Sequence, residues 1–163
     1  MKATRTLNFI RRNVYQCTAE VKSLAYKALV RPHTEYANAA WDPYLEKDTH
    51  CLEMVQRRAA RFAYRDYRHT TSVTDLLRDL QWPLLAERRK NSRLTLFFKM
   101  EHGLSGVSLD HLQKPTRHTR FSDKTTFQVL LSRTDLYKYS YFPRTIVDWN
   151  TLSSETRLKP SVQ

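Results

Sequence analysis

The stretch that decides the fold is LEMVQRRAARFAYR, residues 52–65. Its apolar side chains recur at intervals of three and four residues, at Leu52, Val55, Ala59 and Phe62. This spacing places them on one side of an α-helix. It predicts a helix from about residue 45 to residue 64 that turns one face toward a core.

Arginines recur on a second side of the same predicted helix. Arg57, Arg61 and Arg65 are spaced i, i+4 and i+8, Arg58 lies beside them, and Arg68 extends the row if the helix continues. Such a row can follow a phosphate backbone, because a planar guanidinium forms paired hydrogen bonds with phosphate oxygens. The alternative is a solvated face whose arginines pair with acids. Acids are few nearby, so the pattern favours backbone binding.

Two helical patterns precede this stretch. Residues 3–14 have apolar side chains at helical spacing and carry Arg11 and Arg12 on the polar side. Thr18 is a good N-cap for a second helix. The core-facing stripe of that second helix is predicted to be Val21, Leu24, Ala25, Ala28 and Leu29.

Two more helices are predicted after it. Ser72 opens a short helix with a capping sequence. Pro83 suits the first turn of a long helix that ends at Gly103. The second half of the long helix, residues 94–100, is apolar on nearly all sides, so we expect it at the centre of a helical bundle.

Eight basic residues are candidates for contact with nucleic-acid phosphates. The first group lies on the central helix and comprises Arg57, Arg58, Arg61 and Arg65. The second group lies on the flanking helices and comprises Arg88, Lys99, Arg11 and Arg12.

The pattern changes beyond Gly106. Residues 113–126 are polar and basic, which is typical of a linker. Apolar residues alternate over 127–131 and tyrosines over 137–141, which predicts two short strands. Tyrosines next to basic residues would also suit stacking of unpaired bases, although alternation favours burial in a small core. We therefore predict a mainly α chain: a helical bundle over residues 1–112, then a linker and a small mixed C-terminal subdomain over 113–163.

The composition points to a polyanionic partner. The 163 residues include 28 Lys and Arg against 16 Asp and Glu, a net charge of +12 and a pI near 10.0. Residues 1–100 hold 19 basic and 10 acidic residues, whereas residues 101–163 hold 9 and 6. The first part is therefore the better candidate for the electrostatic footprint of nucleic acid.

Several function classes lack their sequence motifs. With two glycines, the chain has no phosphate-binding or dinucleotide-binding loop. No two aspartates are adjacent, and no Cys-x-x-Cys or His-x-x-x-His pair occurs, so we expect neither a catalytic site nor a metal site. No apolar run is long enough to span a membrane.

Several stretches, taken in order, resemble the downstream portion of reverse transcriptases from LINE-type (non-LTR) retrotransposons. They are residues 2–13, 25–32, 35–37, 41–43, 52–62, 80–83, 87–89, 142–146 and 148–150, and together they extend over nearly the entire chain. The central one is LEMVQRRAARF, and the last two are FPRTI and DWN.

The resemblance implies the thumb, and the region that follows it, of a larger RNA-directed DNA polymerase. In that family the fingers and palm lie upstream, and the palm holds magnesium on a Tyr/Phe-x-Asp-Asp motif that this chain lacks. The resemblance therefore implies no catalytic residue or cofactor here. It implies a template–primer duplex and the upstream palm and fingers as partners, in the nucleus. The alternatives are a helical protein-interaction module or an inactive, decayed copy.

Overall fold

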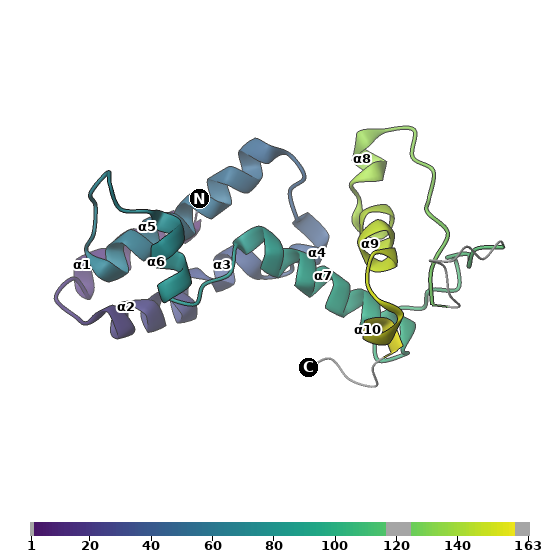
Figure 1. Cartoon of the computed structure of the whole chain (residues 1–163), viewed down its shortest axis with the longest axis horizontal. Coiled ribbons are helices and arrows are strands. Elements are labelled where there is room, and N and C mark those ends of the chain that lie inside the picture. The colour runs from purple at the N-terminus through teal and green to yellow at the C-terminus, as the bar shows by residue number, and fades with distance from the viewer. Residues whose placement is uncertain (1, 117–124, 159–163) are drawn as a thin grey trace. The chain divides into compact units, whose positions relative to one another are not determined.

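The computed structural model describes residues 2–116 and 125–158, and in these ranges the chain forms helices joined by turns and loops, with no strand (Figure 1). The mainly α class is confirmed. In chain order the elements are α1 (Lys2–Asn13), α2 (Ala19–Ala25), a π-helical turn η1 (Tyr26–Val30), α3 (Pro32–Glu35), α4 (Asn38–Trp41), α5 (Glu46–Tyr64), α6 (Val73–Asp79), α7 (Leu85–Glu101), α8 (Asp135–Lys138), α9 (Tyr141–Asn150) and α10 (Ser154–Leu158).

The chain divides into two compact units, Met1–Arg89 and Lys90–Gln163, so the division falls within α7. The sequence pattern placed the division after residue 112. Residues 90–112 pack instead with the C-terminal segment, because Phe97, Leu109 and Leu112 share a core with Trp149. The predicted linker over 113–126 lies partly outside the described residues.

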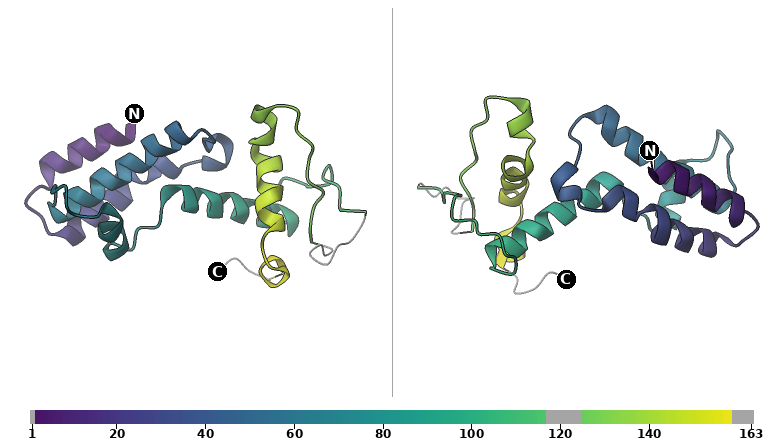
Figure 2. Two further views of the ribbon diagram at one scale, coloured as in Figure 1. Left: turned by 45° about the horizontal axis from the view of Figure 1, so that its top comes forward. Right: turned by 180° about the vertical axis from the view of Figure 1, so that it is seen from behind.

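The first unit is built around α5, which packs against α1, α2 and α6 (Figure 2 shows α1 beside α5). The predicted inward face of α5 is confirmed, since Leu52, Val55, Ala59 and Phe62 are all buried. Tyr26 stacks on Trp82 in the same core, with ring centroids 4.3 Å apart. This core holds the ends of α1 and α5 in fixed positions.

The predicted core stripe of the second helix is wrong. Val21, Leu24 and Leu29 are exposed, and the exposed fraction of Leu24 is 67%. Lys22, Tyr26 and Val30 are buried in their place. The π-helical turn, closed by the hydrogen bond from Arg31 N to Tyr26 O, adds one residue to the turn and shifts the phase of the side chains after α2, where Val30 is buried and Leu29 is exposed.

The predicted N-caps are confirmed, and one cap that the sequence pattern missed overturns the predicted strands. Thr18 and Ser72 accept hydrogen bonds from the backbone of α2 and α6. Thr134 likewise accepts one from Tyr137 N and begins α8. Residues 137–141 therefore lie in and between α8 and α9, and residues 127–131 form no regular element. Local capping outweighs the alternation of tyrosines, so the described part of the predicted mixed tail contains helices and irregular segments and no strand.

The core of the second unit surrounds Phe97, Ile146 and Trp149. Beside it, the Asp148 carboxylate accepts hydrogen bonds from Lys90 and Arg93. Burial by itself would raise the pKa of Asp148, but the hydrogen bonds from these two cations more than offset it and hold the pKa below its ordinary value. Residues 94–100, predicted as the centre of the bundle, thus form part of this second core.

Candidate nucleic-acid interface

Two of the predicted arginines lie open on α5. Arg58 is exposed and Arg57 is half-buried. Within residues 2–116 and 125–158, neither side chain makes a hydrogen bond or an ion pair. Both guanidinium groups therefore keep their hydrogen-bonding capacity for an external acceptor.

The predicted row of arginines breaks after Arg61. The helix ends at Tyr64, and Arg65 adopts a left-handed conformation with φ 56°. Arg61 turns its guanidinium to the loop after α5 and donates to the carbonyl of Arg68 at 3.0 Å. Arg57, Arg61 and Arg65 therefore do not line up along one helix face, and the predicted straight track of three arginines is wrong.

The loop after α5 is held by its own polar contacts. The Asp66 carboxylate accepts hydrogen bonds from the Arg68 guanidinium, at 2.7 Å, and from the Thr71 hydroxyl. These hydrogen bonds, with Arg68 as the first cause, lower the pKa of Asp66 well below its ordinary value. Tyr67 lies between the two partners of this ion pair in the sequence.

Arg65 instead joins a basic cluster at the end of α1. Its guanidinium donates to the carbonyl of Tyr15 and lies 4.5 Å from the centroid of the Tyr15 ring. Arg11 lies 5.9 Å from the centroid of Tyr67. Both distances are in the cation–π range. The structure thus brings together Arg11 of the second predicted group and Arg65 of the first.

A hollow of about 420 Å³ opens at this cluster, and we call it the α1 hollow. Its lining consists of Asn8, Arg11, Arg12, Tyr15 and Tyr67. The exposed fractions of Tyr15 and Tyr67 are 54% and 48%, so about half of each side chain is open to solvent. No carboxylate lines the hollow, which leaves its charge positive.

A buried lysine lies next to Tyr15. Lys22 has an exposed fraction of 2%, and its Nζ is 5.1 Å from the Phe62 ring centroid and 6.0 Å from that of Tyr15. Burial lowers the pKa of Lys22, and the charge of Arg65 lowers it further. A buried ammonium next to aromatic rings adds positive potential behind the α1 hollow.

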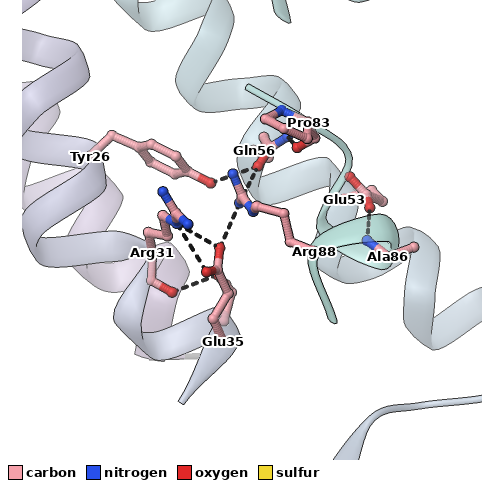
Figure 3. Close-up of polar contacts among 9 residues, drawn as sticks. Tyr26, Arg31, Glu35, Glu53, Gln56, Pro83, Ala86 and Arg88 are labelled. Carbon is pink, nitrogen blue, oxygen red and sulfur yellow. Dashed lines mark hydrogen bonds and ion pairs between the residues drawn. The ribbon is translucent and has the colours of Figure 1, made fainter. Parts of the chain in front are cut away.

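Arg88 does not lie on an open surface. Figure 3 shows its guanidinium between α3 and α5, where Nη2 donates to Glu35 Oε1 at 2.6 Å and to Gln56 Oε1 at 2.9 Å. Arg31 Nε donates to the same Glu35 carboxylate at 2.9 Å, and Tyr26 Oη donates to Gln56 Oε1 at 3.1 Å. Burial raises the pKa of Tyr26 to about 12. The Arg88 side chain is 12% exposed, so a phosphate cannot reach it without disrupting these contacts.

The remaining candidates are dispersed. Arg12 is exposed at the end of α1, and Lys99 is exposed on the part of α7 that belongs to the second unit. Sequence reasoning missed Tyr15, Tyr67 and Lys22. Their only signal is an aromatic residue a few positions from an arginine, which is too common to single out a site.

Neither a metal site nor a membrane helix is found in the part of the chain that the structure describes. No three His, Cys, Asp or Glu side chains gather there in a way that could hold an ion. None of the helices in these ranges has the length and apolar content needed to cross a bilayer. Comparisons with protein-family models, with curated proteins and with solved structures find no match to this chain.

Proposed function

We propose that the chain binds nucleic acid through the basic surface of its first unit. The observation that carries this proposal is the division of its arginines into two sets. One set is paired with carboxylates: Arg31, Arg68, Arg78, Arg88 and Arg89. The other set has no carboxylate partner among the described residues and is exposed or half-buried: Arg5, Arg11, Arg12, Arg57, Arg58, Arg61 and Arg65. Unpaired arginines on a basic chain favour a phosphate backbone.

The binding has little dependence on base sequence, because phosphates carry no sequence information. A test compares two variants that each remove two charges: Arg57→Gln/Arg58→Gln on α5, and Arg133→Gln/Lys138→Gln in the second unit. Glutamine keeps helix propensity close to that of arginine. Fluorescence anisotropy with a 20-base-pair duplex gives the dissociation constant over a salt series.

The α5 variant is expected to bind more weakly and to have a salt slope shallower by about two units, at roughly 0.9 per phosphate contact. The second-unit variant should keep the parent slope. Equal slopes for the parent and the α5 variant, with unchanged circular dichroism, would remove α5 from the interface.

We further propose, from the resemblance, that this unit is the thumb of a LINE-type reverse transcriptase and holds its template–primer duplex. The resemblance puts magnesium and the catalytic aspartates in an upstream palm. The purified chain is therefore expected to give only background primer extension with magnesium and nucleotides. Extension that co-purifies with the protein through two chromatographic steps would contradict this assignment.

A second candidate function is protein docking, and the exposed apolar side of α2 and η1 favours it. Val21, Leu24 and Leu29 all lie open to solvent there. Apolar residues gathered on an exposed helix face mark protein interaction sites. The variant Leu24→Asn/Leu29→Asn separates the two functions, because it leaves the basic surface intact. Loss of duplex affinity in this variant would show that the apolar face belongs to the nucleic-acid interface.

A further inference from the structure

We infer that the α1 hollow binds a single unpaired nucleotide, whose base stacks on a tyrosine and whose phosphate is held by arginine. This inference rests on the proposed nucleic-acid binding and adds to it the kind of nucleotide that the first unit selects. Three properties of the hollow carry it: its aromatic surface, its charge and its size.

The aromatic surface suits a base that is not paired. Tyr15 and Tyr67 expose about half of their side chains at the hollow. Bases in a duplex cover one another, whereas an unpaired base has a free face that stacks on aromatic side chains regardless of its identity. The Arg11 guanidinium lies 5.9 Å from the centroid of the Tyr67 ring, so a cation is already next to the ring on which the base would stack.

The charge suits a phosphate. Arg11 and Arg12 line the hollow, and Arg65 lies against its Tyr15 wall. Asn8 adds an amide that both donates and accepts hydrogen bonds, as a base edge requires. No carboxylate lines the hollow to compete with an anion. A nucleotide presents an aromatic ring, an anion and hydrogen-bonding edges together, and each has a counterpart here.

The size of the hollow suits one nucleotide. The hollow has a volume of about 420 Å³, within the range of roughly 300–1,000 Å³ that small-ligand sites occupy. We therefore assign the duplex backbone to the open α5 surface and an unpaired end to the α1 hollow.

The test uses the full chain with three DNA ligands: a blunt 20-base-pair duplex, the same duplex with a four-nucleotide single-stranded extension, and the extension strand alone. The extension carries 2-aminopurine, whose fluorescence falls when the base stacks. The extension is expected to tighten binding at least about fivefold, the lower limit for one stacked base, and to be quenched on binding.

Tyr67→Leu removes the ring, and Tyr64→Leu is the matched control. Tyr64 is a similarly exposed tyrosine at the end of α5 that does not line the hollow. Tyr67→Leu should abolish both the quenching and the preference for the extension while it leaves the affinity for the blunt duplex within twofold. Tyr64→Leu should behave like the parent.

The outcomes separate this inference from the proposed function. Binding of blunt and extended duplexes with equal affinity would overturn the inference and leave the proposed duplex binding in place. Quenching of the single strand without duplex binding would support the inference and refute the duplex interface. No binding to any ligand would refute both. The inference would also be overturned if a glutamate peptide of the same charge displaced the labelled strand as well as the unlabelled strand does, because charge alone would then suffice for binding.

Discussion

Replacing Glu35 with glutamine should destabilise the first unit, because it removes the carboxylate that both Arg31 and Arg88 contact in Figure 3. The Glu35 carboxylate accepts from Arg31 at 2.9 Å and from Arg88 at 2.6 Å. Arg31 is 37% exposed and can be rehydrated, whereas Arg88 is 12% exposed and would keep only neutral acceptors, the Gln56 amide and the amide introduced at position 35.

The magnitude follows from the burial of Arg88. Leaving one charge of a buried pair without its partner costs about 3–5 kcal/mol. The partial exposure of Arg31 places the expected loss near the lower value, about 3 kcal/mol. For a unit of this size such a loss lowers the melting temperature by roughly 12–24 °C.

Urea denaturation followed by circular dichroism measures the effect on the free energy of unfolding. Asp75→Asn is the matched control, since its ion pair with Arg78 is exposed on α6 and should contribute less than about 1 kcal/mol. The double variant Glu35→Gln/Arg88→Met should recover part of the loss, because it removes the stranded charge as well. A loss for Glu35→Gln no larger than that for Asp75→Asn would refute the reasoning.

Three further predictions concern buried groups. Lys22→Met should raise the free energy of unfolding by about 1–2 kcal/mol at pH 7. Because the pKa of Lys22 is lowered on folding, the charged lysine destabilises the fold at neutral pH, and this destabilisation fades as the pH approaches 10.5. Urea denaturation at pH 10 should therefore show a smaller difference between the variant and the parent. Asp148→Asn should lower the free energy of unfolding by about 3 kcal/mol at pH 7. Since the pKa of Asp148 is held below 3.8, the difference in melting temperature between this variant and the parent should vanish only below pH 3.8. If that difference is already absent at pH 5, the ion pairs of Asp148 do not stabilise the fold. Phe97→Ala should cost about 3–5 kcal/mol, because the side chain is fully buried; a variant that melts like the parent would place Phe97 outside the core.

The sequence pattern predicted the helices well where local chemistry decides them. Thr18 and Ser72 cap helices, as expected from their hydroxyl groups. The apolar spacing of residues 52–62 predicted the inward face of α5. Tyr137 and Tyr141 show the opposite case, because their alternation predicted a strand and the cap at Thr134 was overlooked.

Tertiary packing explains the failures on α2. A stripe of valine and leucine predicted the buried face, yet Lys22 and Tyr26 occupy it. Tyr26 brings a large ring that stacks on Trp82 and a hydroxyl that reaches Gln56. These contacts come from distant parts of the chain, so no local pattern could reveal them.

The candidate site could be predicted only in part. The basic character of α5 was evident from its sequence, and Arg58 is exposed there while Arg57 is half-buried. Two features could not be predicted from the sequence. One is the left-handed turn at Arg65, which directs the Arg65 side chain to Tyr15, and the other is the ion pair with Glu35 that keeps the Arg88 side chain buried. Both depend on where the helix ends and on partners distant in sequence.

The three left-handed positions held by ordinary residues should differ in how freely they change. Ala37, Arg65 and Gln81 have φ values of 50°, 56° and 54°, a conformation in which glycine is less strained. Across a library of single substitutions scored for folding and for nucleic-acid binding, glycine should be well tolerated at positions 37 and 81. At position 65 glycine should retain folding and lose nucleic-acid binding. Arginine would then be kept at this position because its side chain is needed for binding, although the left-handed backbone favours glycine.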